Sequence, residues 1–241
     1  MNDSEKMEIS VVVPVYNEEE NLPILIPKLV EVLKGLGLPY EMIFVDDGSS
    51  DGSRQVLKEW TVLYPSMRIL GLKENRGLST ALIAGMREAR GQTIVTLDSD
   101  LQNDPADIPK LLEQLDSYDM ATGWRQKRED PWLKRTSSKI ANAIRNQLSG
   151  EEIQDSACTL RAFKRECIQD IWVFNGMHRF LSTLVKMKGY RIVEVPVIHH
   201  PRKFGKSKYN IRNRMVPSLL DLLAVRWMRR RHIDYEIEER V

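Results

Sequence analysis

The sequence predicts an α/β fold with a mostly parallel central sheet flanked by helices, and two observations support this class. Through the first half of the chain, apolar runs rich in β-branched residues alternate with segments of helical periodicity, which is the pattern of βαβ units. The first run, from Ile9 to Val15, shows no alternation of polar and apolar residues, as expected of a strand buried on both faces. We therefore expect helices on both sides of the sheet.

In the first half, helices are expected between successive strands. Leu22, Leu25, Leu29 and Leu33 lie on one helical stripe, which predicts the first helix. The second helix, expected at 55–60, follows a run of Asp, Gly and Ser residues at 46–52 that suits a helix cap. The expected elements of this half are strands at 9–15, 40–45, 67–72 and 93–97 and helices at 21–33, 55–60 and 77–89.

In the second half, proline and glycine mark the element boundaries. Pro105 opens a helix at a first-turn position, where its missing N–H costs nothing, and Gly150 ends a basic helix expected over 131–148. Pro196 cannot donate to a strand ladder, so the last strand is expected at an edge of the sheet. The strands expected in this half are 118–123, 157–164 and 191–198.

The chain has 241 residues, enough for one large α/β domain and a short appendage. We expect a catalytic domain over residues 1–208 and an amphipathic helical appendage with a charged tail over 209–241. Lys and Arg number 36 against 34 Asp and Glu, so the charge balance gives no indication of a nucleic-acid-binding protein.

The remaining composition points to the cytoplasm. Cys158 and Cys167 are the only cysteines, and neither their number nor their spacing suits a disulfide framework or a zinc site, so we expect buried free thiols. The N-terminal sequence lacks the features of a secretory signal, and no run reaches the ~20 apolar residues that span a bilayer. We expect a cytoplasmic protein, soluble or peripheral on the cytoplasmic face of a membrane.

Two carboxylates two residues apart, Asp98 and Asp100, follow the fourth expected strand. A strand that ends at Leu97 brings both, with the amide of Gln102, to the carboxyl edge of a parallel sheet, where ligands of open α/β folds bind. Hard oxygen ligands suit Mg²⁺ or Mn²⁺, which bind through one or two carboxylates and the phosphates of a substrate. The pair predicts such a metal site, with a solvated turn as the alternative for an isolated Asp-x-Asp.

Polar groups also follow the first two expected strands, at Tyr16 to Glu19 and at Asp46 to Ser49. Carboxylates at these positions can accept hydrogen bonds from a ring N–H and from ribose hydroxyls. The sequence contains neither a G-x-G-x-x-G nor a P-loop pattern. Phosphate charge must therefore be met by metal and by basic side chains, which concentrate at 125–145, 202–214 and 226–231.

In order and spacing, these strand ends and Asn75-Arg76-Gly77 resemble the family 2 glycosyltransferases, which have the nucleotide-sugar-binding GT-A fold. The resemblance extends from Val12 to about Tyr209. It implies that Mg²⁺ or Mn²⁺ on the donor diphosphate is held by Asp98, Asp100 and Gln102. The positions that it assigns to the nucleotide are Pro14, Tyr16, Glu18, Asp47, Asp98 and Ser99.

Three later segments, 123–139, 155–163 and 199–209, are similar to the polyprenyl-phosphate branch of the family, which includes dolichyl-phosphate mannose synthase. The similarity implies an acceptor-phosphate site at Arg125, Arg135, Ser138 and Lys139. It also implies a basic loop, with Arg202 and Lys208, that closes over the nucleotide diphosphate. The catalytic residues expected from it are Asp100, Asp155, Arg125, Arg202 and Lys208.

The expected function is metal-dependent, inverting transfer of a sugar from a nucleoside diphosphate to a polyprenyl (undecaprenyl or dolichyl) phosphate, in the synthesis of cell-envelope glycans. A phosphate monoester is already ionised near neutral pH, with a second pKa of about 6, so it needs no strong general base. One alternative is a sugar-hydroxyl acceptor with Asp155 as its base. Another is a catalytically silent nucleotide-sugar-binding subunit that docks on a membrane partner.

The C-terminal appendage has apolar residues at helical spacing, including Leu220, Leu223 and Trp227, followed by Arg229 to Arg231. Such a helix can lie in the headgroup layer of a membrane and attract anionic lipids. It can equally pack on the catalytic domain or on a partner, either a second copy of the chain or a membrane protein.

Adjacent residues on a strand face opposite ways. For His199 and His200 we therefore expect one buried and one exposed side chain, and no metal ligand.

Overall fold

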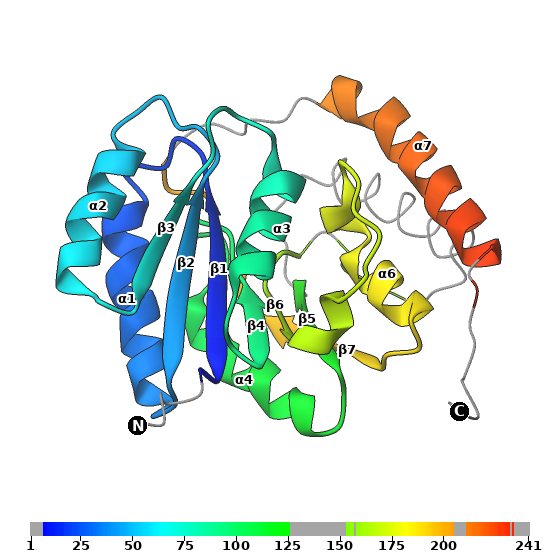
Figure 1. Cartoon of the computed structure of the whole chain (residues 1–241), viewed down its shortest axis with the longest axis horizontal. Helices are drawn as coiled ribbons and strands as arrows, with labels where there is room; N and C mark the ends of the chain where they lie inside the picture. Colours follow the sequence, from blue (N-terminus) through cyan, green and yellow to red (C-terminus); the bar gives the residue numbers. More distant parts are fainter. Residues whose placement is uncertain (1–6, 126–152, 157, 205–210, 232, 234–241) are drawn as a thin grey trace, which may run out of the picture.

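The computed structural model describes residues 7–125, 153–156, 158–204, 211–231 and 233. At its centre lies a seven-stranded sheet in the order β3-β2-β1-β4-β6-β5-β7, with helices on both faces (Figure 1). Within this part of the chain every strand is parallel to its neighbours except β6, which is antiparallel to both β4 and β5. The predicted fold class is confirmed.

The strands are β1 (Ile9–Val15), β2 (Tyr40–Asp46), β3 (Met67–Gly71), β4 (Thr93–Thr96), β5 (Met120–Arg125), β6 (Arg161–Lys164) and β7 (Ile192–Val197). The α-helices are α1 (Leu22–Gly35), α2 (Ser53–Leu63), α3 (Leu78–Glu88), α4 (Ile108–Leu112), α6 (Leu181–Met187) and α7 (Ile211–Arg230). Short 3-10 helices are η1 (Pro105–Asp107), η2 (Glu113–Asp116), η3 (Arg165–Ile168) and η4 (Met177–Arg179).

The expected elements in these residues are present. The strand expected at 157–164 starts only at Arg161, and α6 and the 3-10 helices η2, η3 and η4 were not expected. Pro105 does open the helical turn η1, and β7, with Pro196, does lie at the edge of the sheet. The basic helix expected over 131–148 lies outside the described residues.

Two apolar layers cover the sheet. Side chains of α1, α2 and α4 pack on one face, and side chains of α3, α6 and α7 pack on the other. Helix α3 lies so close to the sheet that a Cβ atom on Gly85 would overlap Val12 and come within 2.9 Å of Val45 Cγ2. The distance of α3 from the sheet is therefore fixed by contact with β1 and β2. The first turn of α3 borders the site described below.

Helix α7 packs through Leu222 and Val225, both buried, on the same apolar layer as α3 and α6. Packing on the catalytic domain, one of the alternatives for this helix, is thus present, while the domain boundary at 208 stays a prediction. Within the described ranges, no helix is both long and apolar enough to cross a bilayer.

Both cysteines are free and buried, as predicted. Burial raises the pKa of Cys158 to about 11 and that of Cys167 to about 12. Because the thiolate is the reactive form, both cysteines are protonated and unreactive at pH 8.

We expect a disulfide reagent such as DTNB to leave the folded protein unmodified over an hour at pH 8. It should titrate two thiols per chain in guanidinium chloride, and rapid reaction of the folded protein would contradict this burial.

Candidate functional site

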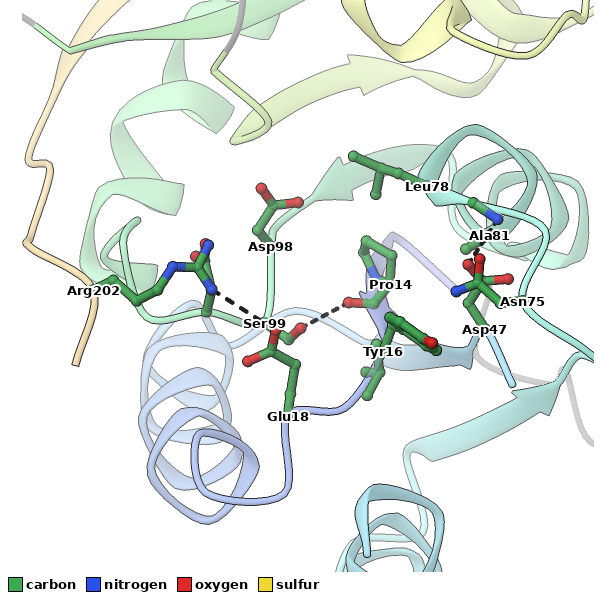
Figure 2. A pocket seen from close by; sticks show the side chains of 13 residues that line it. Pro14, Tyr16, Glu18, Asp47, Asn75, Leu78, Ala81, Asp98, Ser99 and Arg202 are labelled. Atoms are coloured by element: carbon green, nitrogen blue, oxygen red, sulfur yellow. Dashed lines mark hydrogen bonds and ion pairs between the residues drawn. The ribbon is translucent and has the colours of Figure 1, made fainter. Parts of the chain in front are cut away.

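A cavity of about 260 Å³ lies where β1, β2 and β4 end and α3 begins (Figure 2). All six residues that the sequence assigned to the nucleotide border it, together with Asp100 and Arg202. Figure 2 shows Arg202 and Glu18 on one side of the cavity and Asp47 with Asn75 on the other. The lining comprises Pro14, Val15, Tyr16, Glu18, Asp47, Asn75, Gly77, Leu78, Ala81, Asp98, Ser99, Asp100 and Arg202.

The loops that follow β1 and β2 are tied together by hydrogen bonds in both directions. The amide of Asn17 donates to Ser49 Oγ (3.0 Å), and the amide of Ser50 donates back to Asn17 Oδ1 (2.8 Å). The amide of Glu18 donates to Ser53 Oγ at 2.7 Å. Asn17 has a φ of 53°, a left-handed conformation that asparagine tolerates better than most residues. These bonds make the two loops one wall of the cavity.

Asp47 connects this wall to the start of α3. Its carboxylate accepts hydrogen bonds from the amides of Arg76 (2.7 Å) and Gly77 (2.8 Å). Burial raises the pKa of Asp47, and the two backbone hydrogen bonds oppose that rise. A carboxylate has about four acceptor positions, so Asp47 can still accept a hydrogen bond from a ligand in the cavity.

The loop after β4 carries the Asp98-Ser99-Asp100 sequence. Ser99 Oγ donates to the carbonyl oxygen of Pro14 at 2.9 Å, which fixes this loop to the end of β1. Asp98 opens onto the cavity, yet burial and the negative charge of Asp100 raise its pKa to about 7. Positive charge from Arg161 and Arg125 and a hydrogen bond from Thr159 oppose this shift.

Arg202, in the segment after β7, reaches into the same group of carboxylates. Its Nη2 donates to Asp100 Oδ2 at 2.5 Å, and its Nη1 lies 3.9 Å from Glu18 Oε1. The same Nη2 is 3.5 Å from Gln102 Oε1. The resemblance implied that Arg202 contacts the nucleotide diphosphate, and the structure places it at the edge of the cavity in contact with Asp100.

Arg125 and Asp155 form a bidentate ion pair. Arg125 Nε and Nη2 donate to Asp155 Oδ2 and Oδ1 at 2.6 and 2.8 Å, and the Asp155 side chain is buried. Neither residue is among the described residues that line the cavity. Asp155 therefore fixes the orientation of the Arg125 guanidinium.

A second buried arginine, Arg161, completes this group of charges and was missed by the sequence reasoning. Its side chain is 1% exposed, and its Nη2 donates to the carbonyl oxygen of Ser156 at 3.1 Å. Across the described residues its Nε and Nη1 have no hydrogen-bond partner. The available signal was a charged residue between the apolar residues Leu160 and Ala162 of an expected strand.

His199 and His200 were predicted incorrectly, because both are partly exposed. His200 Nε2 lies 3.2 Å from Asp104 Oδ2, and this hydrogen bond helps to lower the pKa of Asp104 against the raising effect of burial. His199 Nε2 lies 3.5 Å from Gln102 Nε2. His199 thus borders the group of candidate metal ligands, which its place in the sequence did not indicate.

The donor atoms around Asp98 and Asp100 fit a hard divalent cation. In the part of the chain that the structure describes, no three His, Cys, Asp or Glu side chains converge closely enough to hold a metal by themselves. A cation bound to Asp98, Asp100 and Gln102 would take further ligands from phosphate oxygens and water, as Mg²⁺ commonly does. Four residues assigned from the sequence, Arg135, Ser138, Lys139 and Lys208, lie outside the described residues.

Residues 10–172 match the family described as Glycosyl transferase family 2. The chain belongs to this family. In this glycosyl transferase of family 2, the Asp98-Ser99-Asp100 sequence lies inside the matched region, and Arg202 lies after its end.

Solved structures share the fold of this glycosyl transferase. One is glucosyl-3-phosphoglycerate synthase from Mycobacterium tuberculosis, in complex with Mn²⁺, UDP and phosphoglyceric acid. It has a TM-score of 0.69 and 19% identity over 95% of this chain and 80% of that chain. Another is the mannosyltransferase PcManGT from Pyrobaculum calidifontis with GDP-Man and Mn²⁺, with a TM-score of 0.59 and 22% identity over 92% of this chain and 64% of that chain.

Arg161 supplies buried positive charge near two carboxylates, so its removal should destabilise the fold. We expect Arg161→Met to lower the free energy of unfolding by roughly 3–5 kcal/mol, because it leaves Asp98 and Asp155 with too little compensating charge. Urea unfolding followed by circular dichroism measures this. The control Arg87→Met, on the exposed face of α3, should change it by less than about 0.5 kcal/mol. Equal losses in both variants would contradict the charge balance.

Proposed function

We propose that this family 2 glycosyl transferase moves a sugar, with inversion, from a nucleoside diphosphate to a polyprenyl phosphate at the cytoplasmic face of a membrane, and that it requires Mg²⁺ or Mn²⁺. The observation that carries the donor half of the proposal is the grouping of Asp47, Asp98, Asp100 and Arg202 around one cavity. The uncharged residues Pro14 and Tyr16 suit a base, and the Asp47 carboxylate suits a ribose. Asp98, Asp100 and Arg202 suit a metal-bound diphosphate.

The nucleoside would occupy the wall formed by the loops after β1 and β2. Pro14 and Tyr16 offer a flat apolar surface to a base, and Asp47 and Glu18 offer acceptors to ring N–H groups and ribose hydroxyls. This wall is already held by its own hydrogen bonds. Donor binding would therefore need little ordering of the loops, which favours affinity.

The departing diphosphate would lie between Asp98, Asp100 and Arg202. Asp98, Asp100 and Gln102 would hold the divalent cation, whose charge would stabilise the negative charge that develops on the leaving group. Arg202, with Lys208, would add hydrogen bonds and positive charge to the same oxygens. These residues position and stabilise the leaving group without a proton transfer.

The acceptor assignment is supported by the state of Asp155. Its two carboxylate oxygens accept a bidentate pair of hydrogen bonds from Arg125, and Asp155 is not among the described residues that line the cavity. A phosphate acceptor arrives ionised and needs no base, whereas a sugar hydroxyl does. This geometry favours a phosphate over the hydroxyl alternative.

Transfer of radiolabelled sugar from a panel of nucleoside diphosphate sugars into organic-extractable lipid tests the proposal. With polyprenyl phosphate and Mn²⁺, we expect label in the lipid phase from one donor. Asp100→Ala should reduce transfer at least about 100-fold, because it removes a ligand of the cation that would stabilise the charge on the leaving group. Asp116→Ala, at an exposed site on η2, should leave transfer unchanged. Donor binding without lipid product across the whole panel would overturn the polyprenyl-phosphate assignment.

Asp155→Asn separates the two acceptor classes. If Asp155 orients Arg125, the variant should keep measurable transfer and an unchanged dependence of kcat on pH, because an amide still accepts a hydrogen bond from Arg125. If Asp155 were a general base, the loss would be about 10²- to 10⁴-fold and the low-pH limb of the profile would disappear. Initial rates across the pH range, measured with whichever acceptor supports transfer, polyprenyl phosphate or a sugar, distinguish these outcomes.

A further inference from the structure

Helix α7 presents a second apolar face that the protein core does not cover. Leu222 and Val225 point into the core, whereas Leu220, Leu223 and Trp227 are 60%, 49% and 60% exposed. Large apolar side chains that are exposed together mark interaction surfaces more often than scattered ones do. The exposed residues recur at intervals of three and four, so they share one side of the helix.

The same side of α7 becomes basic at its C-terminal end. Continuing the spacing from Trp227 leads to Arg230, the last residue of α7, and to Arg231, which directly follows the helix; both are exposed. We name these residues the outer stripe: Leu220, Leu223, Trp227, Arg230 and Arg231. Two turns of exposed apolar side chains are thus followed by positively charged side chains on the same side of the helix.

The orientation of the outer stripe is fixed by contacts on the opposite side of α7. Asp221 pairs with Arg179 Nη1 at 3.5 Å, and a Cβ atom on Gly176 would lie 2.5 Å from Asp221 Oδ2, so the loop before η4 is closely packed there. That loop also exposes Trp172 and Val173, at 51% and 46%. Figure 1 shows α7 along the outer side of the molecule, on the far side of α3 from β1, β2 and β3.

We propose that the outer stripe docks on the surface of a bilayer that contains anionic lipids. The proposal rests on the proposed function in one respect, because a polyprenyl phosphate acceptor resides in a membrane. Leucine and tryptophan side chains suit the boundary between headgroups and acyl chains, and arginines suit lipid phosphates.

Charge favours this occupant over another protein surface. Asp221 is the only acidic residue in the sequence of α7, whereas Arg229, Arg230 and Arg231 are all exposed at its C-terminal end. Asp221 is paired with Arg179 on the inward side, so it does not offset the arginines of the outer stripe. A surface of this composition is attracted to a sheet of negative charge, and the attraction must weaken with salt.

Co-sedimentation with vesicles tests the surface independently of catalysis. The vesicles contain phosphatidylcholine alone or phosphatidylcholine with about one third phosphatidylglycerol, and no polyprenyl phosphate. We expect the full chain to bind the anionic vesicles, to bind neutral ones at least about tenfold more weakly, and to dissociate as salt is raised. Equal binding to both kinds of vesicle, or binding to neither, would overturn the proposal.

Two variants and a matched control locate the contact. Leu223→Ser with Trp227→Ser removes the apolar part of the outer stripe, and Arg230→Gln with Arg231→Gln removes its charge. Each pair should lower the vesicle partition coefficient at least about tenfold. Val62→Ser with Leu63→Ser changes two exposed apolar residues of α2, at 82% and 65% exposure, and should leave binding unchanged. Circular dichroism verifies that all three fold.

Two further outcomes are informative. If the chain forms a dimer that Leu223→Ser with Trp227→Ser dissociates, and vesicles are not bound, the stripe is a self-interface and the proposal is wrong. Transfer to a detergent-dispersed short-chain polyprenyl phosphate measures the proposed function separately. Vesicle binding without such transfer would refute only the function, and transfer without vesicle binding would refute only the docking surface.

Discussion

The compensation of negative charge at Asp98 and Asp100 is the constraint on which the rest of the site depends. Two carboxylates in one short loop repel each other, and burial increases that repulsion. Guanidinium groups from the second half of the chain offset this repulsion. Arg161 approaches Asp98 from within the sheet, and Arg202 contacts Asp100 from the segment after β7. The loop can therefore hold both carboxylates at the cavity before any ligand enters.

The reversed strand β6 makes this compensation possible. Because β6 is antiparallel to β4 and β5, its first residue lies at the edge of the sheet where those strands end, with Arg161 opposite Thr96 and Thr122. The segment that precedes β6 then supplies Asp155 to Arg125 at the end of β5. The antiparallel strand β6 thus lies between the strands that border the cavity and the strands near the expected acceptor residues.

The sequence predicted the parts of this structure that depend on local patterns. Buried strands appear as apolar runs, and Asp98 and Asp100 could be placed because a strand end determines an edge of the sheet. Helix α6 was not predicted, because most of its seven residues are buried and no polar face produces a periodic pattern. The 157–164 strand was predicted too long, because Cys158 and Leu160 are buried without belonging to the ladder of β6.

The side-chain contacts across the site could not be predicted in the same way. The bonds between Asn17 and Ser49, between Asp47 and Gly77, and between Arg202 and Asp100 connect residues 30 to 102 positions apart. Such contacts depend on how neighbouring loops are positioned relative to one another at the edge of the sheet, which no local pattern encodes. Arg161 is the clearest case, since its burial depends on the direction of a strand whose neighbours are distant in sequence.

The contact between Arg202 and Asp100 has a consequence for the order in which ligands bind. On the proposed function, a divalent ion that arrives alone must compete with a guanidinium already bound to one of its ligands. An ion that arrives with a diphosphate offers Arg202 new oxygens in exchange for Asp100. Metal and nucleotide are then thermodynamically linked, and each raises the affinity of the other by the same factor. The resting enzyme would therefore discriminate against free divalent ions and select the metal–nucleotide complex.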